Sequence, residues 1–245
     1  MKRAIIVSGG ECRDSFVLNY VNRSDFSIRI AADKGLEFFA RNGIAPTHMV
    51  GDFDSVDAAV CASLFSCPED LQKALFLLKE GDKEQTFALS DGAVVVKHPS
   101  MKDATDTELA VDLAIREGAG EILLMAATGS RVDHTMANIG TLIYALQRGA
   151  DCRIVDSHNA ISVAAADCEH PAEIHLLKKH MFGNYVSLLP WTAQVKGLTL
   201  SGFRYPLQDA SLSMGSTLGI SNEVTEEVAR IAFREGILII VEALD

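Results

Sequence analysis

The chain of 245 residues is predicted to be an α/β protein, with an N-terminal domain built on a mainly parallel sheet and a smaller C-terminal β-sandwich domain. Along the first 160 residues, short β-branched segments alternate with segments of helical periodicity, which is typical of a parallel sheet covered by helices. After residues 156–159 the pattern changes to strand-like segments separated by turn residues, for which a β-sandwich or roll is the simplest closure. We place the domain boundary between residues 165 and 166.

Four predicted strands of the first domain end in polar or glycine-containing segments. The strands cover residues 4–8, 28–32, 48–51 and 122–127, and they lead into residues 9–10, 33–35, 52–55 and 128–131. In open α/β sheets, ligands bind beyond the carboxyl ends of the strands. We therefore expect these four segments to lie close together and to form the functional site.

The third of these segments belongs to the sequence Gly-Asp-Phe-Asp-Ser at residues 51–55. Alternate residues of a strand point to the same side, so Asp52 and Asp54 can place two carboxylates around one hard cation. Mg²⁺ accepts such oxygen ligands and keeps coordination positions for phosphate. The same residue types also form ordinary strand-to-loop turns, so the segment alone indicates a turn as readily as a metal site.

The segment from residue 56 to residue 100 is less regular, and we interpret it as an insertion in the α/β scaffold. We expect a helix over residues 69–79 and a hairpin around residues 90–92, where Ser-Asp-Gly is a turn sequence. We assign no chemistry to this segment.

A helix with an acidic start is predicted to begin within residues 102–108. Asp103 would be its N-cap, and Asp106, three residues later, resembles the reciprocal partner in a capping box. Negative charge is favoured there by the helix dipole and needs no ligand. The alternative is that Asp106 faces the same crevice as Asp52 and Asp54 and completes a site of three carboxylates for a cation.

The fourth segment, Thr-Gly-Ser-Arg-Val-Asp-His at residues 128–134, leads into another helix. Backbone N–H groups at the helix start and the guanidinium of Arg131 together suit phosphate oxygens, while Asp133 could orient a substrate hydroxyl or serve the metal. The alternative is that His134 and Asn138, one helical turn apart, form only a polar pair. Neither the P-loop spacing G-x-x-x-x-G-K-[ST] nor a G-x-G-x-x-G after the first strand is present.

The C-terminal part is predicted to form strands that include residues 173–177, 185–189, 195–200, 211–214 and 237–241. Residues 223–234 fit a helix or a strand equally well by periodicity. Trp191, Phe203 and Tyr205 lie in or beside its predicted loops. Aromatic residues of a small β domain usually belong to the core, although an exposed one could stack on a flat ring.

The composition argues against several classes of function. The net charge of −11 opposes nucleic acid as a partner, because phosphate backbones are bound by clustered Lys and Arg. No apolar segment approaches the ~18–20 residues of a membrane span, and the apolar start of the chain is too short for a signal peptide. The five cysteines are scattered without a C-x-x-C pair, which favours neither a disulfide framework nor a zinc site. We therefore expect a cytoplasmic protein without membrane association.

Five short motifs follow one another along the chain. They are Ala-Asp-x-Gly at residues 32–35, Gly-Asp-Phe-Asp-Ser at 51–55, Asp-x-Thr-Asp at 103–106, Thr-Gly-x-Arg-x-Asp-His-x-x-Ala-Asn at 128–138 and Gly-x-Ser-Asn-Glu at 219–223. In order and content they closely resemble the thiamin pyrophosphokinase family, especially its bacterial type. Each motif is weak alone, but five in this order are highly specific. The chain departs from the family at Lys34, where a second Gly is common, and in the lengthened segment 56–100.

The resemblance implies transfer of the pyrophosphoryl group of Mg-ATP to the hydroxyl of thiamin, giving thiamin diphosphate and AMP. Such chemistry depends chiefly on in-line positioning and on neutralising charge. The family's motifs imply that Asp52, Asp54 and Asp106 are catalytic and bind Mg²⁺, and that Asp133 contacts or activates the thiamin hydroxyl. They also imply that the nucleotide site includes Asp33, Asp103, Thr128, Gly129, Ser130 and Arg131.

The family's fold, as the resemblance implies it, is a Rossmann-like α/β domain for ATP and Mg²⁺ over residues 1–165 and a β-sandwich domain for thiamin over residues 166–245. The family assembles as a homodimer, and thiamin lies between domains of different subunits, which places the active site at the subunit interface. Ser221 and Asn222 would contact thiamin from the β domain, with nearby aromatic or apolar side chains against its rings. By themselves these two residues indicate only a β-turn.

Two other functions fit part of the sequence. Asp52-x-Asp54-Ser55 after a strand resembles the opening motif of haloacid-dehalogenase-like phosphatases, in which the first Asp is a nucleophile. That motif usually follows the first strand, whereas here it follows the third. A nucleotide-sensing or thiamin-sensing module would keep the binding residues without turnover, and it predicts tight binding without release of AMP.

Overall fold

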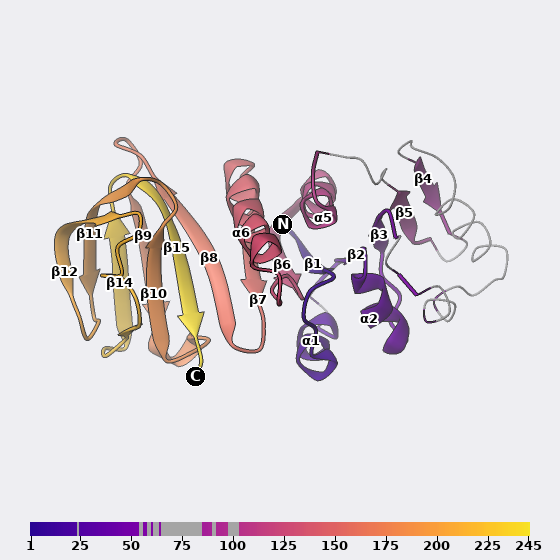
Figure 1. The fold of residues 1–245 in the computed structure, drawn as a ribbon, viewed down its shortest axis with the longest axis horizontal. Helices are drawn as coiled ribbons and strands as arrows, with labels where there is room; N and C mark the ends of the chain where they lie inside the picture. The colour runs from indigo at the N-terminus through magenta and orange to yellow at the C-terminus, as the bar shows by residue number, and fades with distance from the viewer. Residues whose placement is uncertain are drawn as a thin grey trace. The chain divides into compact units, whose positions relative to one another are not determined.

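The computed structural model describes residues 1–23, 25–53, 56–57, 60, 64, 85–89, 92–97 and 103–245. These residues form two compact units, Met1–Cys152 and Arg153–Asp245 (Figure 1). The predicted helix over residues 69–79 lies outside the described residues.

The first unit is built on a mainly parallel sheet with the strand order β6-β1-β2-β3-β5-β4. Its strands are β1 (Lys2–Val7), β2 (Ile28–Ala32), β3 (His48–Gly51), β4 (Gln85–Ala88), β5 (Val94–Lys97) and β6 (Ala119–Met125). The pairs β1/β2, β1/β6, β2/β3 and β3/β5 are parallel. The last four residues of β1, residues 4–7, are apolar and fully buried, as expected for a strand covered on both faces.

Four helices cover the two faces of this sheet. They are α1 (Asp14–Val21), α2 (Gly35–Arg41), α5 (Asp106–Arg116) and α6 (Val132–Gln147). In Figure 1, α1 and α2 lie on one side of the strands and α5 and α6 on the other. The chain adds β2, β3 and β5 in one direction from β1 and then returns to β6 on the opposite side of β1, so right-handed crossovers place the later helices on the other face. This reversal opens a crevice beyond the carboxyl ends of β1 and β6.

The start of α5 corrects the predicted helix cap. Thr105, and not Asp103, is the N-cap, since its Oγ1 accepts a hydrogen bond from the backbone N–H of Glu108 at 3.2 Å. Thr105 and Glu108 have the Thr-x-x-Glu spacing of a capping box, a local signal that the acidic residues obscured. Asp106 is the first residue of the helix, where the helix dipole favours its charge.

The hairpin predicted around residues 90–92 is confirmed. Strands β4 and β5 pair antiparallel, and Leu89 N–H donates to the carbonyl oxygen of Ala93 at 2.8 Å across the turn. Strand β5 also pairs with β3, so that Lys97 lies opposite Gly51. The hairpin therefore extends the sheet beside the segment that carries Asp52.

The second unit consists of two antiparallel sheets packed as a sandwich (Figure 1). Its strands are β8 (Asn159–Ala166), β9 (Ala172–Leu177), β10 (Tyr185–Pro190), β11 (Gln194–Ser201), β12 (Leu207–Ser213), β13 (Asn222–Glu223), β14 (Val228–Phe233) and β15 (Gly236–Ala243). One sheet has the order β13-β10-β15-β8, and the end of β7 (Asp151–Val155) pairs with β8. The other sheet has the order β12-β11-β14-β9. A short helix, η2 (Lys178–His180), follows β9.

The period of two in the sequence explains the core of this sandwich. In β14, Ala229, Ile231 and Phe233 are buried, while the residues between them face outward. Residues 223–234, which fitted helix or strand by periodicity, therefore belong to strands β13 and β14 and the turn that joins them. Phe203 belongs to the core, as predicted for most aromatics here, whereas Tyr205 is 59% exposed.

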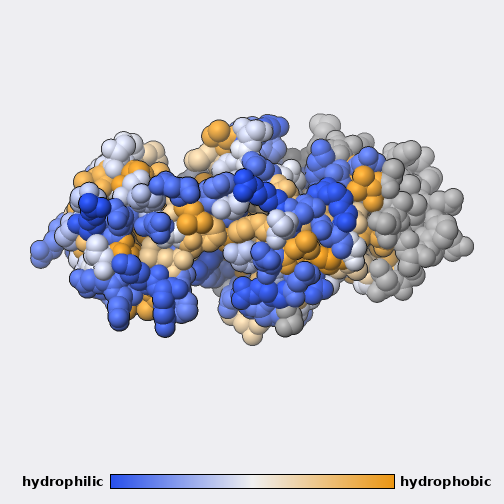
Figure 2. Space-filling model, turned by 90° about the horizontal axis from the view of Figure 1, so that it is seen from below, coloured by the Kyte–Doolittle hydropathy of each residue, from blue (hydrophilic) through white to orange (hydrophobic). Residues whose placement is uncertain are grey.

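Hydrophilic side chains cover much of the face shown in Figure 2, with hydrophobic ones in smaller groups between them. Within the described residues, no helix combines the length and apolar character that crossing a bilayer requires. Cys12, Cys152 and Cys168 carry free thiols, while Cys61 and Cys67 lie outside the described residues.

Candidate functional site

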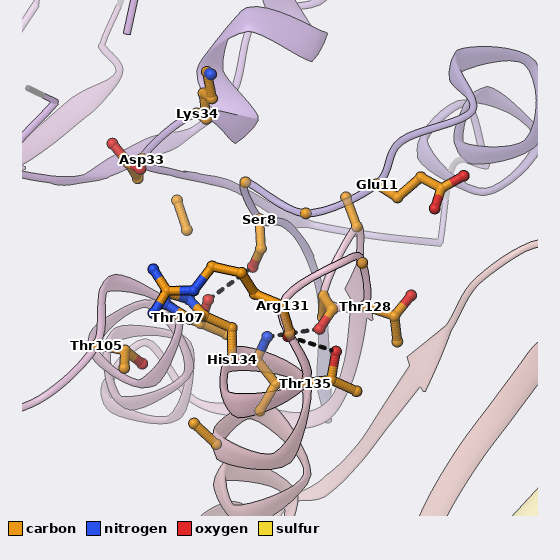
Figure 3. A pocket seen from close by; sticks show the side chains of 18 of the residues that line it. Ser8, Glu11, Asp33, Lys34, Thr105, Thr107, Thr128, Arg131, His134 and Thr135 are labelled. Carbon is orange, nitrogen blue, oxygen red and sulfur yellow. Dashed lines mark hydrogen bonds between the residues drawn. The ribbon is translucent and has the colours of Figure 1, made fainter. Parts of the chain in front are cut away.

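A cavity of about 590 Å³ lies in the first unit, beyond the carboxyl ends of β1, β2 and β6 and at the amino-terminal ends of α5 and α6 (Figure 3). Three of the four strand ends singled out in the sequence line it directly. Figure 3 shows Asp33 and Lys34 across the cavity from Arg131, His134 and Thr135. This volume is in the range of small-molecule sites.

The backbone around the cavity is tightly packed between the loops after β1 and β6. The N–H of Gly10 donates to the carbonyl oxygen of Ala126 at 2.7 Å, and that of Glu11 donates to Thr128 at 2.8 Å. A Cβ at Gly10 would overlap the carbonyl oxygens of Ala126 and Thr128. Glycine is therefore required there, and the two loops form one continuous wall.

Three non-glycine residues at these strand ends have left-handed backbone conformations. Asp33 after β2 has φ 47°, Phe53 after β3 has φ 57°, and Ala126 after β6 has φ 51°. Such conformations cost free energy and persist where the surrounding structure imposes them, often at functional sites. Their concentration at the ends of three strands, within the row β6-β1-β2-β3, marks this edge of the sheet as the candidate site.

Of the predicted carboxylates that the structure describes, two lie at the cavity, whereas Asp52, Asp103 and Asp133 are not among its lining residues. Asp33 and Asp106 line the cavity. The Oδ1 atom of Asp106 lies 3.5 Å from where a Cβ on Gly51 would be, which places it beside the residue that precedes Asp52. Asp54 lies outside the described residues. No group of three His, Cys, Asp or Glu with metal-binding geometry occurs in the described part of the chain, so the set of three carboxylates stays a prediction.

Asp103 occupies a different position from Asp106. It is exposed, precedes the N-cap of α5 and does not line the cavity. The two acidic residues of the Asp-x-Thr-Asp motif, which capping and coordination could not separate in the sequence, are therefore distinguished by the structure.

The opposite wall is the turn of Thr128, Gly129 and Ser130 together with the start of α6. Arg131, 68% exposed, forms a two-pronged ion pair with Asp133, with its NH2 nitrogen 2.6 Å from Oδ2 and its Nε 3.2 Å from Oδ1. The hydrogen bonds from Arg131 lower the pKa of Asp133 to about 2. Asp133 is therefore ionised at neutral pH and is a weak base.

Asn138 is buried, and its amide nitrogen donates to the backbone carbonyl of Ala127 at 2.7 Å. The side-chain nitrogen of Asn138 is therefore bonded to the loop after β6, and not to His134 as the expected polar pair required. Asn138 instead fixes the loop after β6 to the body of α6.

Several cavity residues were not selected from the sequence as functional. Ser8 and Thr107 line the cavity with hydroxyl groups 3.1 Å apart. Lys34, noted only as a departure from the family, also lines the cavity and forms no ion pair within the described part of the chain. Part of their signal was positional, because Ser8 ends the first predicted strand and Lys34 lies in the segment that follows the second.

The predicted thiamin residues of the second unit have contrasting environments. Ser221 is exposed with φ 54°, and its N–H donates to Ser187 Oγ at 3.0 Å. Asn222 is 5% exposed. Its Oδ1 accepts hydrogen bonds from the N–H of Tyr205 at 3.0 Å and of Glu223 at 2.9 Å, and its Nδ2 donates to the Tyr205 carbonyl at 2.8 Å. The Asn222 side chain therefore joins β13 to the segment that presents Tyr205.

Two sequence families match the chain. "Thiamin pyrophosphokinase, catalytic domain" matches residues 19–154, and "Thiamin pyrophosphokinase, vitamin B1 binding domain" matches residues 172–238. A thiamine pyrophosphokinase of Bacillus subtilis (strain 168) is 28% identical over 246 residues, which cover 100% of both chains.

Solved structures agree with these matches. The crystal structure of thiamine pyrophosphokinase from Bacillus subtilis is 29% identical, with a TM-score of 0.78 over 100% of both chains. That of thiamin pyrophosphokinase from Geobacillus thermodenitrificans is 31% identical, with a TM-score of 0.73 over 99% of this chain and 98% of that one. The mixed α/β fold with a second, sandwich-forming sheet is thus common to all three chains.

Proposed function

Because the chain belongs to the thiamin pyrophosphokinase family and makes thiamin diphosphate by pyrophosphoryl transfer from ATP to thiamin, we propose that the cavity of the first unit holds Mg-ATP during this transfer. One observation carries the proposal: carboxylates, a glycine-lined wall and the start of α6 surround one cavity at the end of a parallel sheet. This arrangement also supports a Rossmann-like nucleotide domain over residues 1–165, with thiamin bound by residues 166–245.

Asp52, Asp54 and Asp106 are the proposed ligands of Mg²⁺. Carboxylate oxygens suit this cation, and the position of Asp106 beside Gly51 supports the pairing of α5 with the end of β3. When bound with ATP, Mg²⁺ neutralises negative charge on the phosphate oxygens. The exposed position of Asp103 supports a role at the margin of the nucleotide site and not as a ligand.

The phosphates of ATP are proposed to lie against the Thr128 to Ser130 turn and the amino-terminal end of α6, where backbone N–H groups and the helix dipole favour anions. Arg131 lines this wall and Lys34 lines the opposite one, so each is proposed to supply a positive charge to the phosphates. Asp33 shapes the polar floor between these cations and the metal ligands.

In the transfer, the hydroxyl oxygen of thiamin forms a bond to the β-phosphorus while the bond from that phosphorus to the α,β-bridging oxygen breaks, and AMP leaves. The hydroxyl loses its proton to solvent. Asp133 is proposed to accept a hydrogen bond from this hydroxyl and to orient it, because a carboxylate with a pKa of about 2 removes a proton poorly.

Thiamin is proposed to contact the second unit around Ser221 and Asn222. The hydrogen bonds of Asn222 support an indirect role, in which this side chain holds the segment of Tyr205 in place. Tyr205 is 59% exposed and could lie against a thiamin ring.

A homodimer with the active site at the subunit interface completes the proposal. Exposed apolar side chains on each unit support it: Val132 and Met136 are 71% and 46% exposed on α6, and Met214 and Leu218 are 63% and 59% exposed in the second unit. A second copy of the chain could cover them. Light scattering of the purified protein tests this part, and a monomer at all concentrations would contradict it.

We also propose a cytoplasmic location and partners limited to ATP, thiamin and the second subunit, without nucleic acid or membrane. The free thiols of Cys12, Cys152 and Cys168 support a reducing compartment.

The deciding experiment incubates purified protein with ATP, Mg²⁺ and thiamin and measures AMP and thiamin diphosphate, with controls that lack thiamin or metal. Equal amounts of both products, dependent on all three components, are expected. Free phosphate would instead indicate phosphatase activity, and thiamin binding without product would indicate a sensing module.

A further inference from the structure

Two buried hydroxyl groups connect the sheet of the first unit to the first turn of α5. The Oγ of Ser8 and the Oγ1 of Thr107 lie 3.1 Å apart and join positions 99 residues apart in the chain. Ser8 is 4% and Thr107 is 9% exposed. Figure 3 shows this hydrogen bond within the cavity, between the end of β1 and the start of α5.

Thr107 directly follows Asp106, so a contact that fixes Thr107 also fixes the Asp106 backbone. The local cap made by Thr105 and Glu108 defines where the helix begins, but both residues belong to the same helical turn and cannot set its position on the sheet. Ser8 can, because its own N–H donates to the Met125 carbonyl of β6 at 2.9 Å. The hydroxyl pair therefore links the first turn of α5 to two strands.

A carboxylate that binds a cation must be held at a fixed distance from the other ligands of that cation. Asp106 Oδ1 lies close to the backbone of Gly51, beside Asp52. Metal–oxygen distances tolerate deviations of only about 0.2 Å, so a small shift of α5 would separate these carboxylates beyond what one cation can join.

We propose that Ser8 and Thr107 are a positioning pair that holds the Asp106 carboxylate in register with Asp52 for the cation of Mg-ATP. Neither hydroxyl contacts the reacting atoms in this assignment. The inference rests on the proposed role of Asp106 as a metal ligand and extends it to two residues outside the metal-binding set.

The test compares Ser8→Ala, Thr107→Val, the double variant and Thr107→Ser, which keeps the hydroxyl. Binding of Mn²⁺ is measured by electron paramagnetic resonance with a non-hydrolysable ATP analogue, and thermal unfolding is followed in parallel. Each single variant should weaken Mn²⁺ binding about tenfold, as loss of groups that orient metal ligands does, while Thr107→Ser should bind like the wild type.

The double variant separates positioning from simple stability. Each single variant leaves one buried hydroxyl without its partner and should lower the melting temperature, whereas removing both hydroxyls should restore much of it. We expect Mn²⁺ binding of the double variant to remain weak although its melting temperature recovers. If binding recovers together with the melting temperature, the pair is only structural and the proposal is wrong.

Two controls complete the design. Tyr144→Phe removes the hydrogen bond from Tyr144 to Asp112, at 2.7 Å between α6 and α5 away from the cavity, and should lower stability without changing Mn²⁺ binding. Asp106→Asn should weaken Mn²⁺ binding strongly. If Asp106→Asn binds Mn²⁺ like the wild type, the proposed ligand itself is wrong and so is the inference. Weak binding by Asp106→Asn with normal binding by the hydroxyl variants would overturn the inference alone.

Discussion

The cavity edge of the first unit and the Asn222 region of the second unit use polar side chains in opposite ways. Around the cavity, Asp33 and Ala126 have left-handed backbones, and carboxylates and cations from different strand ends face one space. In the second unit, the Asn222 side chain is buried and makes three hydrogen bonds to backbone groups. The polar groups around the cavity border a space in which a ligand can bind, whereas the Asn222 side chain holds the segment of Tyr205 in place.

A second hollow strengthens this contrast. It measures about 280 Å³ and lies on the small sheet of the second unit. Its two arginines already have partners, since Arg230 lies 2.5 Å from Glu173 and Arg234 lies 2.6 Å from Asp209. The charges around this hollow therefore balance one another, and the molecule's candidate chemistry stays with the cavity of the first unit.

The largest effect is expected from substitutions in the Asp-x-Thr-Asp motif, which contains one acidic residue at the cavity and one outside it. Asp106→Asn should lower kcat/KM about 10²–10³-fold, because it removes a charge placed beside the transferred phosphates. Its fold should be intact, since Thr105 and not Asp106 caps α5. Asp103→Asn is the matched control and should stay close to wild type. Steady-state kinetics at several Mg²⁺ concentrations measure both, and equal losses would contradict the assignment.

The next effect concerns the second unit. Asn222→Ala should lower the free energy of unfolding by about 1–3 kcal/mol, because buried backbone groups of Tyr205 and Glu223 lose their partners. The KM for thiamin should rise as the Tyr205 segment loosens. Ser221→Ala should leave stability unchanged, since the hydrogen bond from Ser221 to Ser187 is made by the backbone N–H. Urea denaturation and thiamin kinetics test both, and unaltered stability of Asn222→Ala would show that its hydrogen bonds are dispensable.

A smaller effect is expected at Lys34. Lys34→Ala should raise the KM for ATP about fivefold, the equivalent of roughly 1 kcal/mol for an exposed charge pair, with little change in kcat. Lys34→Arg should retain most of the affinity, and Lys179→Ala on the exposed η2 should have no effect. A KM for ATP that does not respond to Lys34→Ala would remove this residue from the phosphate wall.

The smallest expected effect is that of Asp133 on the pH profile of kcat, which should not depend on this residue between pH 5 and 8. Arg131 lowers the pKa of Asp133 from 3.8 to about 2. The contribution of this pair to stability is thus present above pH 3.8 and is lost as the pH falls through about 2, so it does not change between pH 5 and 8. Asp133→Asn should lower kcat while the shape of the pH profile over that range stays the same. Loss of an acidic limb in this variant would show that Asp133 acts as a base.

Some features of the fold are specified by short-range signals in the sequence. Strands β2 and β3 begin and end where the sequence predicted, because β-branched segments and the turn residues after them are short-range signals. The cap of α5 was also local, yet the prediction placed it at Asp103, two residues before Thr105, in a segment where several capping residues stand close together. Competing local signals, and not missing ones, caused that error.

By itself, the sequence determined the α/β character of the first unit, the strand-rich character of the second, the five motifs and, through them, the family and its reaction. Only the tertiary structure decided that Asp106 lines the cavity while Asp103 does not. It also decided that the Asn222 side chain accepts a hydrogen bond from Tyr205 and that Ser8 forms a hydrogen bond with Thr107. The physical reason is the range of the interactions. Hydrophobic periodicity and turn chemistry act over a few residues, whereas the partner of a buried polar group is fixed by packing between segments that lie far apart in the chain.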